Sequence, residues 1–202
     1  MIIYNIHPVN PQCRLIDSTA RICKNEGGIA VYPTDTVYGM GVCLSNVKAI
    51  DRISRLLHKD TKRLFSFICS DFSQMSQFVH ISNKHFKLMK RYLPGPYTFI
   101  LPASRLVPKK IVPKRKTVGI RIPACKTVIE LVKSLDEPLA NTSINLPGGM
   151  RGNPDEVRPA VLNEVDVMLD AGPLDNPIGS TIVDLTDDEP VLLRLGKGVW
   201  ND

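Results

Sequence analysis

The fold of this chain is decided by the stretch Gly27-Gly28-Ile29-Ala30-Val31-Tyr32-Pro33-Thr34-Asp35-Thr36-Val37-Tyr38-Gly39-Met40-Gly41. Its apolar run 29–32 predicts a short buried strand. Pro33 is expected to end that strand, because proline has no N–H to donate to a neighbouring strand. Polar side chains and two glycines follow at once. Polar groups at the end of a core strand are typical of ligand sites in open α/β sheets, although a plain polar turn has the same composition.

Three further segments repeat this pattern of small polar side chains, or a cation, at the edge of a β-branched strand. They are Lys114-Arg115-Lys116-Thr117-Val118-Gly119-Ile120-Arg121-Ile122-Pro123, Leu139-Ala140-Asn141-Thr142-Ser143-Ile144-Asn145-Leu146-Pro147-Gly148-Gly149 and Gly179-Ser180-Thr181-Ile182-Val183-Asp184-Leu185. The repetition favours a shared ligand site over a series of unrelated turns.

Apolar periodicity predicts alternating helices and strands along the whole chain. Ser45 or Asn46 is expected to cap one helix, and Ser82 another that runs through Leu93 with Phe86 and Met89 facing inward. The short turn 186–190 predicts a hairpin, so the sheet should be mixed and not purely parallel. Other helices are expected at 11–26, 126–135 and 156–163, and other strands at 65–69, 97–101, 165–169, 180–185 and 190–194.

The composition predicts one domain over residues 1–202, because no linker or repeat divides the chain. No apolar run approaches the ~20 residues of a membrane span, and the first residues do not form a secretory signal. Five scattered cysteines without a C-x-x-C spacing indicate small buried residues in a reducing cytoplasm, not disulfides or zinc ligands. We expect no dedicated metal site.

Charge is distributed unevenly along the chain. Residues 1–135 carry 22 Lys and Arg against 7 Asp and Glu, whereas residues 136–202 carry 4 against 13. Such asymmetry predicts a face that contacts polyanions, although lysine-rich surfaces are also common without any ligand. The basic residues form three clusters, at 59–63, 84–91 and 105–116. These clusters favour RNA, or the triphosphate of a nucleotide, as a partner.

Together with Pro94-Gly95-Pro96-Tyr97-Thr98-Phe99-Ile100-Leu101, these segments resemble the YrdC family of threonylcarbamoyl-AMP synthases over residues 10 to 195. The resemblance implies a single-domain α/β fold, an open twisted mixed sheet of the YrdC/RibB type with a basic concave surface. It also implies a reaction of L-threonine, bicarbonate and ATP, with Mg²⁺, to threonylcarbamoyl-AMP and pyrophosphate. Such a reaction depends on positioning and on neutralising negative charge. The sequence has no G-x-x-x-x-G-K-[ST] phosphate loop.

The resemblance assigns roles to individual positions. Thr34 and Thr142 match the positions that contact threonine, and Asp35 is expected to form a turn by bonding nearby N–H groups. Tyr38 fits packing and ligand contact equally well. For Arg121 a plain salt bridge is the alternative to phosphate contact. The positions that match nucleotide contacts are Lys59, Arg63, Thr117, Arg121, Ser143, Asn145, Ser180 and Arg194, and the expected RNA contacts are Lys110, Lys114, Arg115 and Lys116.

One segment departs from the synthase pattern. The synthases carry Lys-x-Arg-Pro followed closely by Lys-Pro, but here the stretch reads Leu57-His58-Lys59-Asp60-Thr61-Lys62-Arg63. Lysine cannot reproduce the bidentate hydrogen bonds of arginine. A histidine common near the next strand is also missing, with Cys125 near that place. These changes resemble the YciO branch of the family, whose synthase activity is doubtful.

Two functions of different class therefore stay open. The first is a threonylcarbamoyl-AMP synthase that serves tRNA modification. The second is a protein that binds double-stranded or ribosomal RNA without nucleotide chemistry. A carbamoyl-transfer subunit of a larger enzyme is a third and weaker interpretation. We expect a cytoplasmic protein that does not contact membranes, and the sequence leaves a homodimer open.

Overall fold

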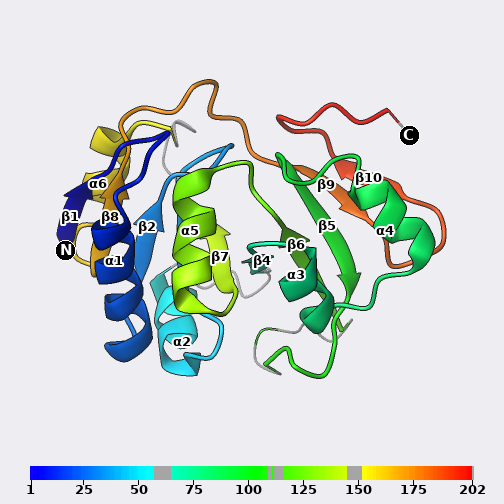
Figure 1. Ribbon diagram of the computed structural model, residues 1–202, viewed down its shortest axis with the longest axis horizontal. Helices are drawn as coiled ribbons and strands as arrows, with labels where there is room; N and C mark the ends of the chain where they lie inside the picture. The colour runs from blue at the N-terminus through cyan, green and yellow to red at the C-terminus, as the bar shows by residue number, and fades with distance from the viewer. Residues whose placement is uncertain (57–64, 109–110, 112–115, 145–151, 202) are drawn as a thin grey trace.

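The computed structural model describes residues 1–56, 65–108, 111, 116–144 and 152–201. One sheet of ten strands runs through this part of the chain (Figure 1). In spatial order its strands are β1 (Ile2–Asn5), β8 (Val167–Asp170), β2 (Ala30–Tyr32), β3 (Gly39–Cys43), β7 (Leu139–Ser143), β4 (Ser66–Ile68), β6 (Thr117–Arg121), β5 (Tyr97–Pro102), β9 (Thr181–Asp184) and β10 (Val191–Arg194).

The sheet is mixed, which confirms the prediction from the hairpin turn. Its parallel pairs are β1 with β8, β8 with β2, β4 with β6, and β5 with β9, whereas the other neighbours are antiparallel. β9 and β10 form the predicted hairpin. β2 ends at Tyr32, directly before Pro33, as a residue without an N–H requires.

In the described part of the chain six helices cover the sheet: α1 (Cys13–Asn25), α2 (Val47–Leu56), α3 (Phe72–Phe78), α4 (Asn83–Met89), α5 (Lys126–Leu135) and α6 (Pro154–Val161). The predicted caps are present, because Asn46 accepts the N–H of Ala49 and Ser82 accepts the N–H of His85. Gly27, just past α1, has a φ of +66°, the left-handed conformation that ends many helices.

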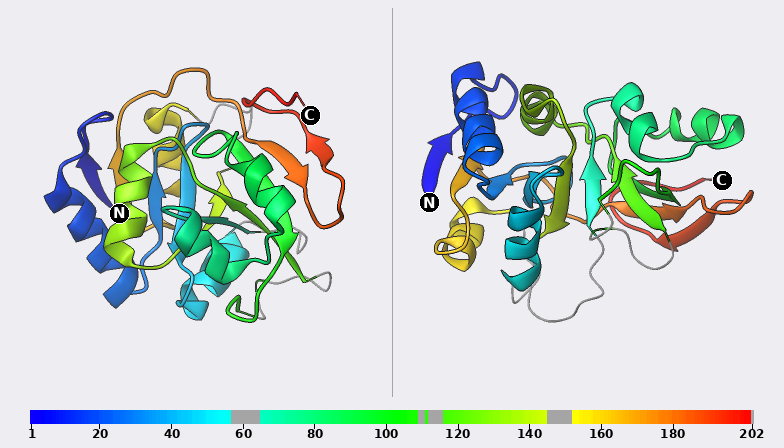
Figure 2. Two further views of the ribbon diagram at one scale, coloured as in Figure 1. Left: turned by 45° about the vertical axis from the view of Figure 1, so that its right-hand side comes forward. Right: turned by 90° about the horizontal axis from the view of Figure 1, so that it is seen from below.

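Side chains alternate between the two faces of each strand, and this alternation defines two cores. On the first face Val31, Val42 and Phe67 pack with residues of α2, α3 and α6. On the second face Ala30, Tyr32, Cys43 and Leu139 pack with α1 and α5. Figure 2 (right) shows α1 and α5 on one side of this part of the sheet and α2 and α6 on the other.

The second face changes character where it leaves α1 and α5. Toward the middle of β7, β4 and β6 it carries polar or very small side chains, because Asn141 lies opposite Ser66 and Ser66 opposite Gly119. A Cβ built on Gly119 would lie 3.1 Å from Thr98 and 3.6 Å from Ser66, so these side chains point the same way. We call Ser66, Thr98, Thr117, Arg121, Asn141 and Ser143 the polar face.

The structure differs from the sequence-based expectations in several elements. Strands β1 and β3 and helix α3 were not expected. The helix from Ser82 ends at Met89, not Leu93. Phe86 faces outward with 37% of its surface exposed, although its ring contacts Phe72. Cys13 is exposed, against the expectation of buried cysteines, and all five thiols are free.

Candidate functional site

The turn after β2 is held by the hydroxyl of Thr34. Its Oγ1 donates to Val37 O at 2.6 Å and accepts from the N–H groups of Thr36 at 3.1 Å and Val37 at 3.2 Å. It also lies 2.9 Å from the Thr36 hydroxyl. Because the Thr34 proton goes to Val37, Thr36 is the donor in that pair. Thr34 is 5% exposed, so its side chain mainly fixes the shape of this turn.

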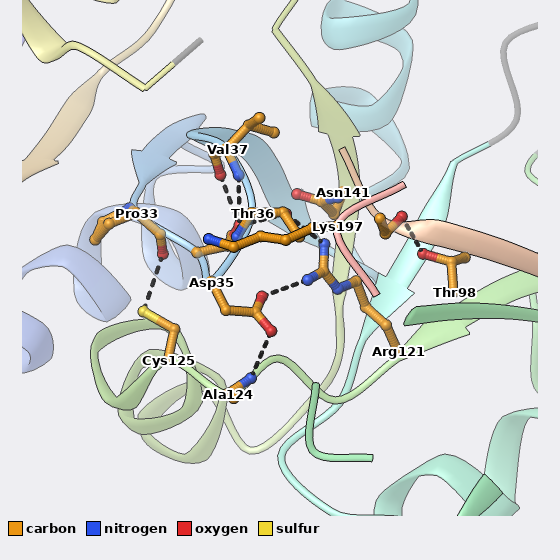
Figure 3. A network of polar contacts seen from close by, with 12 residues as sticks. Pro33, Asp35, Thr36, Val37, Thr98, Arg121, Ala124, Cys125, Asn141 and Lys197 are labelled. Carbon is orange, nitrogen blue, oxygen red and sulfur yellow. Dashed lines mark hydrogen bonds and ion pairs between the residues drawn. The ribbon is translucent and has the colours of Figure 1, made fainter. Parts of the chain in front are cut away.

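Asp35 joins this turn to the end of β6 (Figure 3). Its carboxylate accepts a hydrogen bond from Arg121 Nη2 and another, 2.9 Å long, from the N–H of Ala124. Arg121 Nη1 donates to Thr36 Oγ1 at 3.1 Å. Asp35 was expected to bond nearby N–H groups, and that expectation is wrong: its partners lie more than 85 residues away in the sequence.

Arg121 is a buried cation with its two terminal nitrogens engaged. Its side chain is 6% exposed, and its Nε is buried without a hydrogen-bond partner. Burial lowers the pKa of Arg121, and the adjacent Asp35 opposes that shift. Salt-bridge formation, the alternative reading of Arg121, is therefore present in the structure, and phosphate contact stays a prediction.

Two glycines of β3 make room for a buried hydrogen bond beside this network. Tyr32 Oη donates to Asn141 Oδ1 at 2.8 Å. A Cβ on Gly41 would lie 2.3 Å from Tyr32 Oη, and a Cβ on Gly39 would lie 2.6 Å from Asn141 Oδ1. The glycines that close the 27–41 stretch are thus required by packing.

Ser180 directly precedes β9, which lies across β5 from β6, the strand of Arg121. Its hydroxyl is 2.8 Å from the hydroxyl of Thr98. Arg194 donates from Nε and Nη2 to Ser180 O, at 3.1 and 2.7 Å, and more weakly from Nη2 to Ser180 Oγ at 3.3 Å. The structure therefore brings together Ser180 and Arg194, two of the predicted nucleotide contacts.

The remaining described candidates are spread over the sheet. Thr117 is on the same face as Arg121 but at the other end of β6, about 13 Å away along the strand. Lys116 precedes it with an exposed side chain and a φ of 54°. Thr142 pairs with Met40 of the first face, so the pleat separates it from Ser143 and Asn141. Ser143 is exposed at the end of β7.

Several predicted site residues lie outside the described part of the chain. They are Lys59, Arg63, Asn145, Lys110, Lys114 and Arg115.

Two other side chains near the turn have structural partners. Tyr38 is fully buried, and its hydroxyl donates to Gly172 O and accepts the N–H of Ala171. Packing is thus the reading that fits Tyr38. The Cys125 thiol lies 3.5 Å from Pro33 O, and burial raises its pKa. Cys125 is therefore a neutral thiol at neutral pH and not a nucleophile.

Sequence reasoning missed the contributions of Asp35, Thr98 and Asn141. Thr98 and Asn141 were read only as parts of strands, although a polar residue inside an apolar strand is a signal of a polar face. No local signal predicts the Asp35–Arg121 ion pair, because its two members are far apart in the sequence.

A family model described as "Telomere recombination", which covers Sua5, YciO and YrdC, matches residues 23–196. The chain belongs to this family. Family membership confirms the resemblance to YrdC and YciO proteins and the open mixed α/β sheet expected from it.

Individual relatives cover almost the whole chain. An uncharacterized protein of Haemophilus influenzae is 37% identical over 96% of this chain and 95% of its own length. The uncharacterized protein YciO of Escherichia coli K12 is 38% identical over the same shares, and the crystal structure of E. coli YciO has a TM-score of 0.92, with 98% of both chains covered.

Threonylcarbamoyl-AMP synthases are also similar to this chain. That of Pyrococcus abyssi is 31% identical over 85% of this chain and 51% of its own length. The crystal structure of P. abyssi Sua5 complexed with L-threonine has a TM-score of 0.90 at 29% identity, covering 97% of this chain and 58% of that one.

In the described ranges, His, Cys, Asp and Glu side chains do not form a group of three or more that could hold a metal ion. Within the same ranges, no helix is both long and apolar enough to cross a membrane.

Proposed function

We propose that this chain is an enzyme of the L-threonylcarbamoyl-AMP synthase type, which joins L-threonine, bicarbonate and ATP into threonylcarbamoyl-AMP and pyrophosphate. The observation that carries the proposal is the polar face itself: hydroxyls, an amide and a buried arginine gather on one part of a sheet whose side chains are elsewhere mostly apolar. Burying such groups costs free energy unless they form hydrogen bonds, and Arg121, Thr98 and Asn141 each form one with another side chain.

The chemistry of the polar face suits this reaction. Once the threonine amine is neutral, forming the carbamate and attacking the α-phosphorus need little proton transfer from the protein. They need oriented hydrogen-bond donors that meet developing negative charge. Ser143, Ser180 and Thr98 are such donors, and the neutral thiol of Cys125 adds no competing nucleophile.

L-threonine is proposed to bind against the rigid turn of Thr34. The hydrogen bonds within this turn, and the ion pair that anchors it to β6, fix its position before a ligand arrives. Such preorganisation lowers the entropic cost of binding. Support comes from the likeness to the P. abyssi Sua5 structure that holds L-threonine. Thr142, on the other side of the pleat, is proposed to border the amino acid from β7.

ATP, with Mg²⁺, is proposed to extend across β6 toward β9. Thr117, Arg121, Ser143, Ser180 and Arg194 would line that path, together with Lys59, Arg63 and Asn145. Arg121 would act mainly by holding Thr36 and Asp35, because its terminal nitrogens are already engaged. Mg²⁺ would arrive with the triphosphate, since phosphates commonly supply its ligands.

Calorimetric titration tests this proposal. The purified chain should bind L-threonine and Mg²⁺-ATP, with each ligand tightening the other. Ser143→Tyr, which fills the polar face from an exposed position, should abolish ATP binding while the thermal melting temperature stays unchanged.

A chain that binds neither ligand would refute the proposal. If that chain binds structured RNA with an affinity that falls steeply with salt, RNA binding through Lys110, Lys114, Arg115 and Lys116 becomes the better account.

A further inference from the structure

Of the two described arginines of the proposed nucleotide site, one is paired with a carboxylate and the other already donates hydrogen bonds to the protein. The two terminal nitrogens of Arg121 donate to Asp35 and Thr36, and the Asp35 carboxylate compensates the positive charge of the guanidinium. Arg194 donates hydrogen bonds from Nε and Nη2 to the backbone carbonyl of Ser180. A nucleotide triphosphate carries several negative charges, so its phosphates need a cation whose charge is not already compensated.

Lys197 is such a cation. Its ammonium donates to the neutral backbone carbonyl of Asp175 at 3.0 Å, and none of the ion pairs of the described residues includes it. Its side chain is half-buried. Figure 3 shows this side chain pointing from the C-terminal segment toward the turn that carries Thr36, in the close-up centred on Arg121.

The backbone around Lys197 is fixed by close contacts. The N–H of Lys197 donates to Gly179 O at 2.9 Å, and Thr181 Oγ1 accepts the N–H of Gly196 at 2.9 Å and donates to Gly198 O at 2.5 Å. A Cβ on Gly196 would lie 2.2 Å from Gly179 O, and a Cβ on Gly198 would lie 2.4 Å from the Tyr97 ring. Glycine is therefore required on both sides of the lysine.

We propose that Lys197 binds the β- and γ-phosphates of the nucleotide. It would supply charge that the altered 57–63 stretch no longer provides as a Lys-x-Arg pair. The ammonium would exchange the Asp175 carbonyl for a phosphate oxygen, because a hydrogen bond between two charged groups is stronger than one to a neutral carbonyl. This inference rests on the proposed function, since it names a contact of that same site.

Calorimetric titration of ATP, AMP and L-threonine tests the inference. Lys197→Ala should weaken ATP binding about ten- to a hundredfold, as expected for the loss of a charged hydrogen bond. AMP has no β- or γ-phosphate, so its affinity should change far less, and L-threonine binding should not change. Lys197→Arg, which keeps the charge, should restore most of the ATP affinity.

Lys24→Ala is the matched control. The Lys24 ammonium also donates to a backbone carbonyl, that of Leu135 at 3.1 Å, but it extends from α1, the helix that packs on α5 away from the polar face. This variant should bind all three ligands as the unaltered chain does.

The outcomes separate the two proposals. If the unaltered chain binds ATP and L-threonine but Lys197→Ala leaves ATP affinity unchanged, or weakens ATP and AMP equally, the assignment of Lys197 is wrong and the proposed function stands. If the unaltered chain binds neither ligand, the proposed function is wrong and the assignment of Lys197 falls with it.

Discussion

Asp35, in the turn after β2, accepts a hydrogen bond from Arg121, the last residue of β6, and this ion pair joins two segments 86 residues apart in the sequence. The second oxygen of the same carboxylate accepts the N–H of Ala124, just before α5. One carboxylate thus holds together the turn, the end of a strand and the approach to a helix. The position of the Thr34 turn depends on this contact.

Removing one member of the pair should destabilise the protein strongly. Asp35→Ala leaves a buried guanidinium without its counter-ion, which costs about 3–5 kcal/mol. Asp35→Ala combined with Arg121→Met removes both charges, so the double variant should lose less stability than the sum of the single variants. Urea unfolding measures these free energies. Glu130→Ala, at the half-exposed pair with Lys133, is the control and should cost less than about 1 kcal/mol. Additive losses at positions 35 and 121 would show that the pair is not coupled.

The close approach of Gly41 in β3 to Tyr32 predicts that a substitution of Tyr32 offsets part of the destabilisation caused by a substitution of Gly41. Gly41→Ala places a methyl group against Tyr32 Oη and should cost about 1–3 kcal/mol by overpacking. Tyr32→Phe leaves Asn141 Oδ1 unpaired, which costs about 1–3 kcal/mol. Tyr32→Phe also removes the Oη atom with which the new methyl group of Gly41→Ala would clash. The double variant should therefore lose less free energy of unfolding than the sum of the two single variants. Thermal unfolding of the four proteins checks this, and simple additivity would contradict the contact.

Asp71 gives a pH-dependent contribution to stability. Its side chain accepts the N–H of Gln74 at the start of α3, and this hydrogen bond lowers the pKa of Asp71 below its ordinary value of 3.8. The contribution is therefore fully present above pH 3.8 and is lost as the pH falls through the lowered pKa. Asp71→Ala should cost about 1 kcal/mol at pH 7.

Asp71→Asn provides the comparison for that pH dependence. Asparagine caps helices without an ionisable group, so its contribution should not titrate with the carboxylate. The stability difference between the unaltered chain and Asp71→Asn should shift toward the asparagine variant below pH 3.8. A difference that stays constant with pH would show that the Asp71 carboxylate does not stabilise α3 through its charge.

Thiol labelling tests the packing of the two cores. Burial raises the pKa of Cys23 and Cys69, and it raises that of Cys43 to about 12. These thiols should resist iodoacetamide at pH 8, whereas the exposed Cys13 should react quickly. Mass spectrometry after timed labelling distinguishes the positions, and labelling in urea serves as the control. Rapid labelling of Cys23 in the folded protein would contradict the packing of α1 on the sheet.

The sequence predicted most elements but not their long-range partners. Apolar periodicity indicated helix α5 at 126–135 and the β9–β10 hairpin, because local patterns specify both. β3 was missed, since Gly39 and Gly41 are unfavourable in strands, and their reason, the Tyr32–Asn141 hydrogen bond, lies in another part of the fold. α3 was missed although Asp71 followed by Gln74 was a capping signal.

In the candidate site, too, the sequence predicted local features but not long-range contacts. The sequence identified Thr34, Arg121 and Ser180 as polar residues at strand ends. In the structure Thr34 follows β2, Arg121 ends β6 and Ser180 directly precedes β9. The sequence could not predict that Arg121 would be neutralised by Asp35, because a single sequence carries no record of which distant side chains meet. Nor could it predict that the Lys197 ammonium would donate to the backbone carbonyl of Asp175.

The most direct test of the central claim is pyrophosphate release by the purified chain from Mg²⁺-ATP, measured with and without L-threonine and bicarbonate. The account predicts release only when both are present, together with threonylcarbamoyl-AMP detected by mass spectrometry. Release that ignores L-threonine, or no release by a chain that binds ATP, would contradict the assignment of synthase chemistry to this polar face.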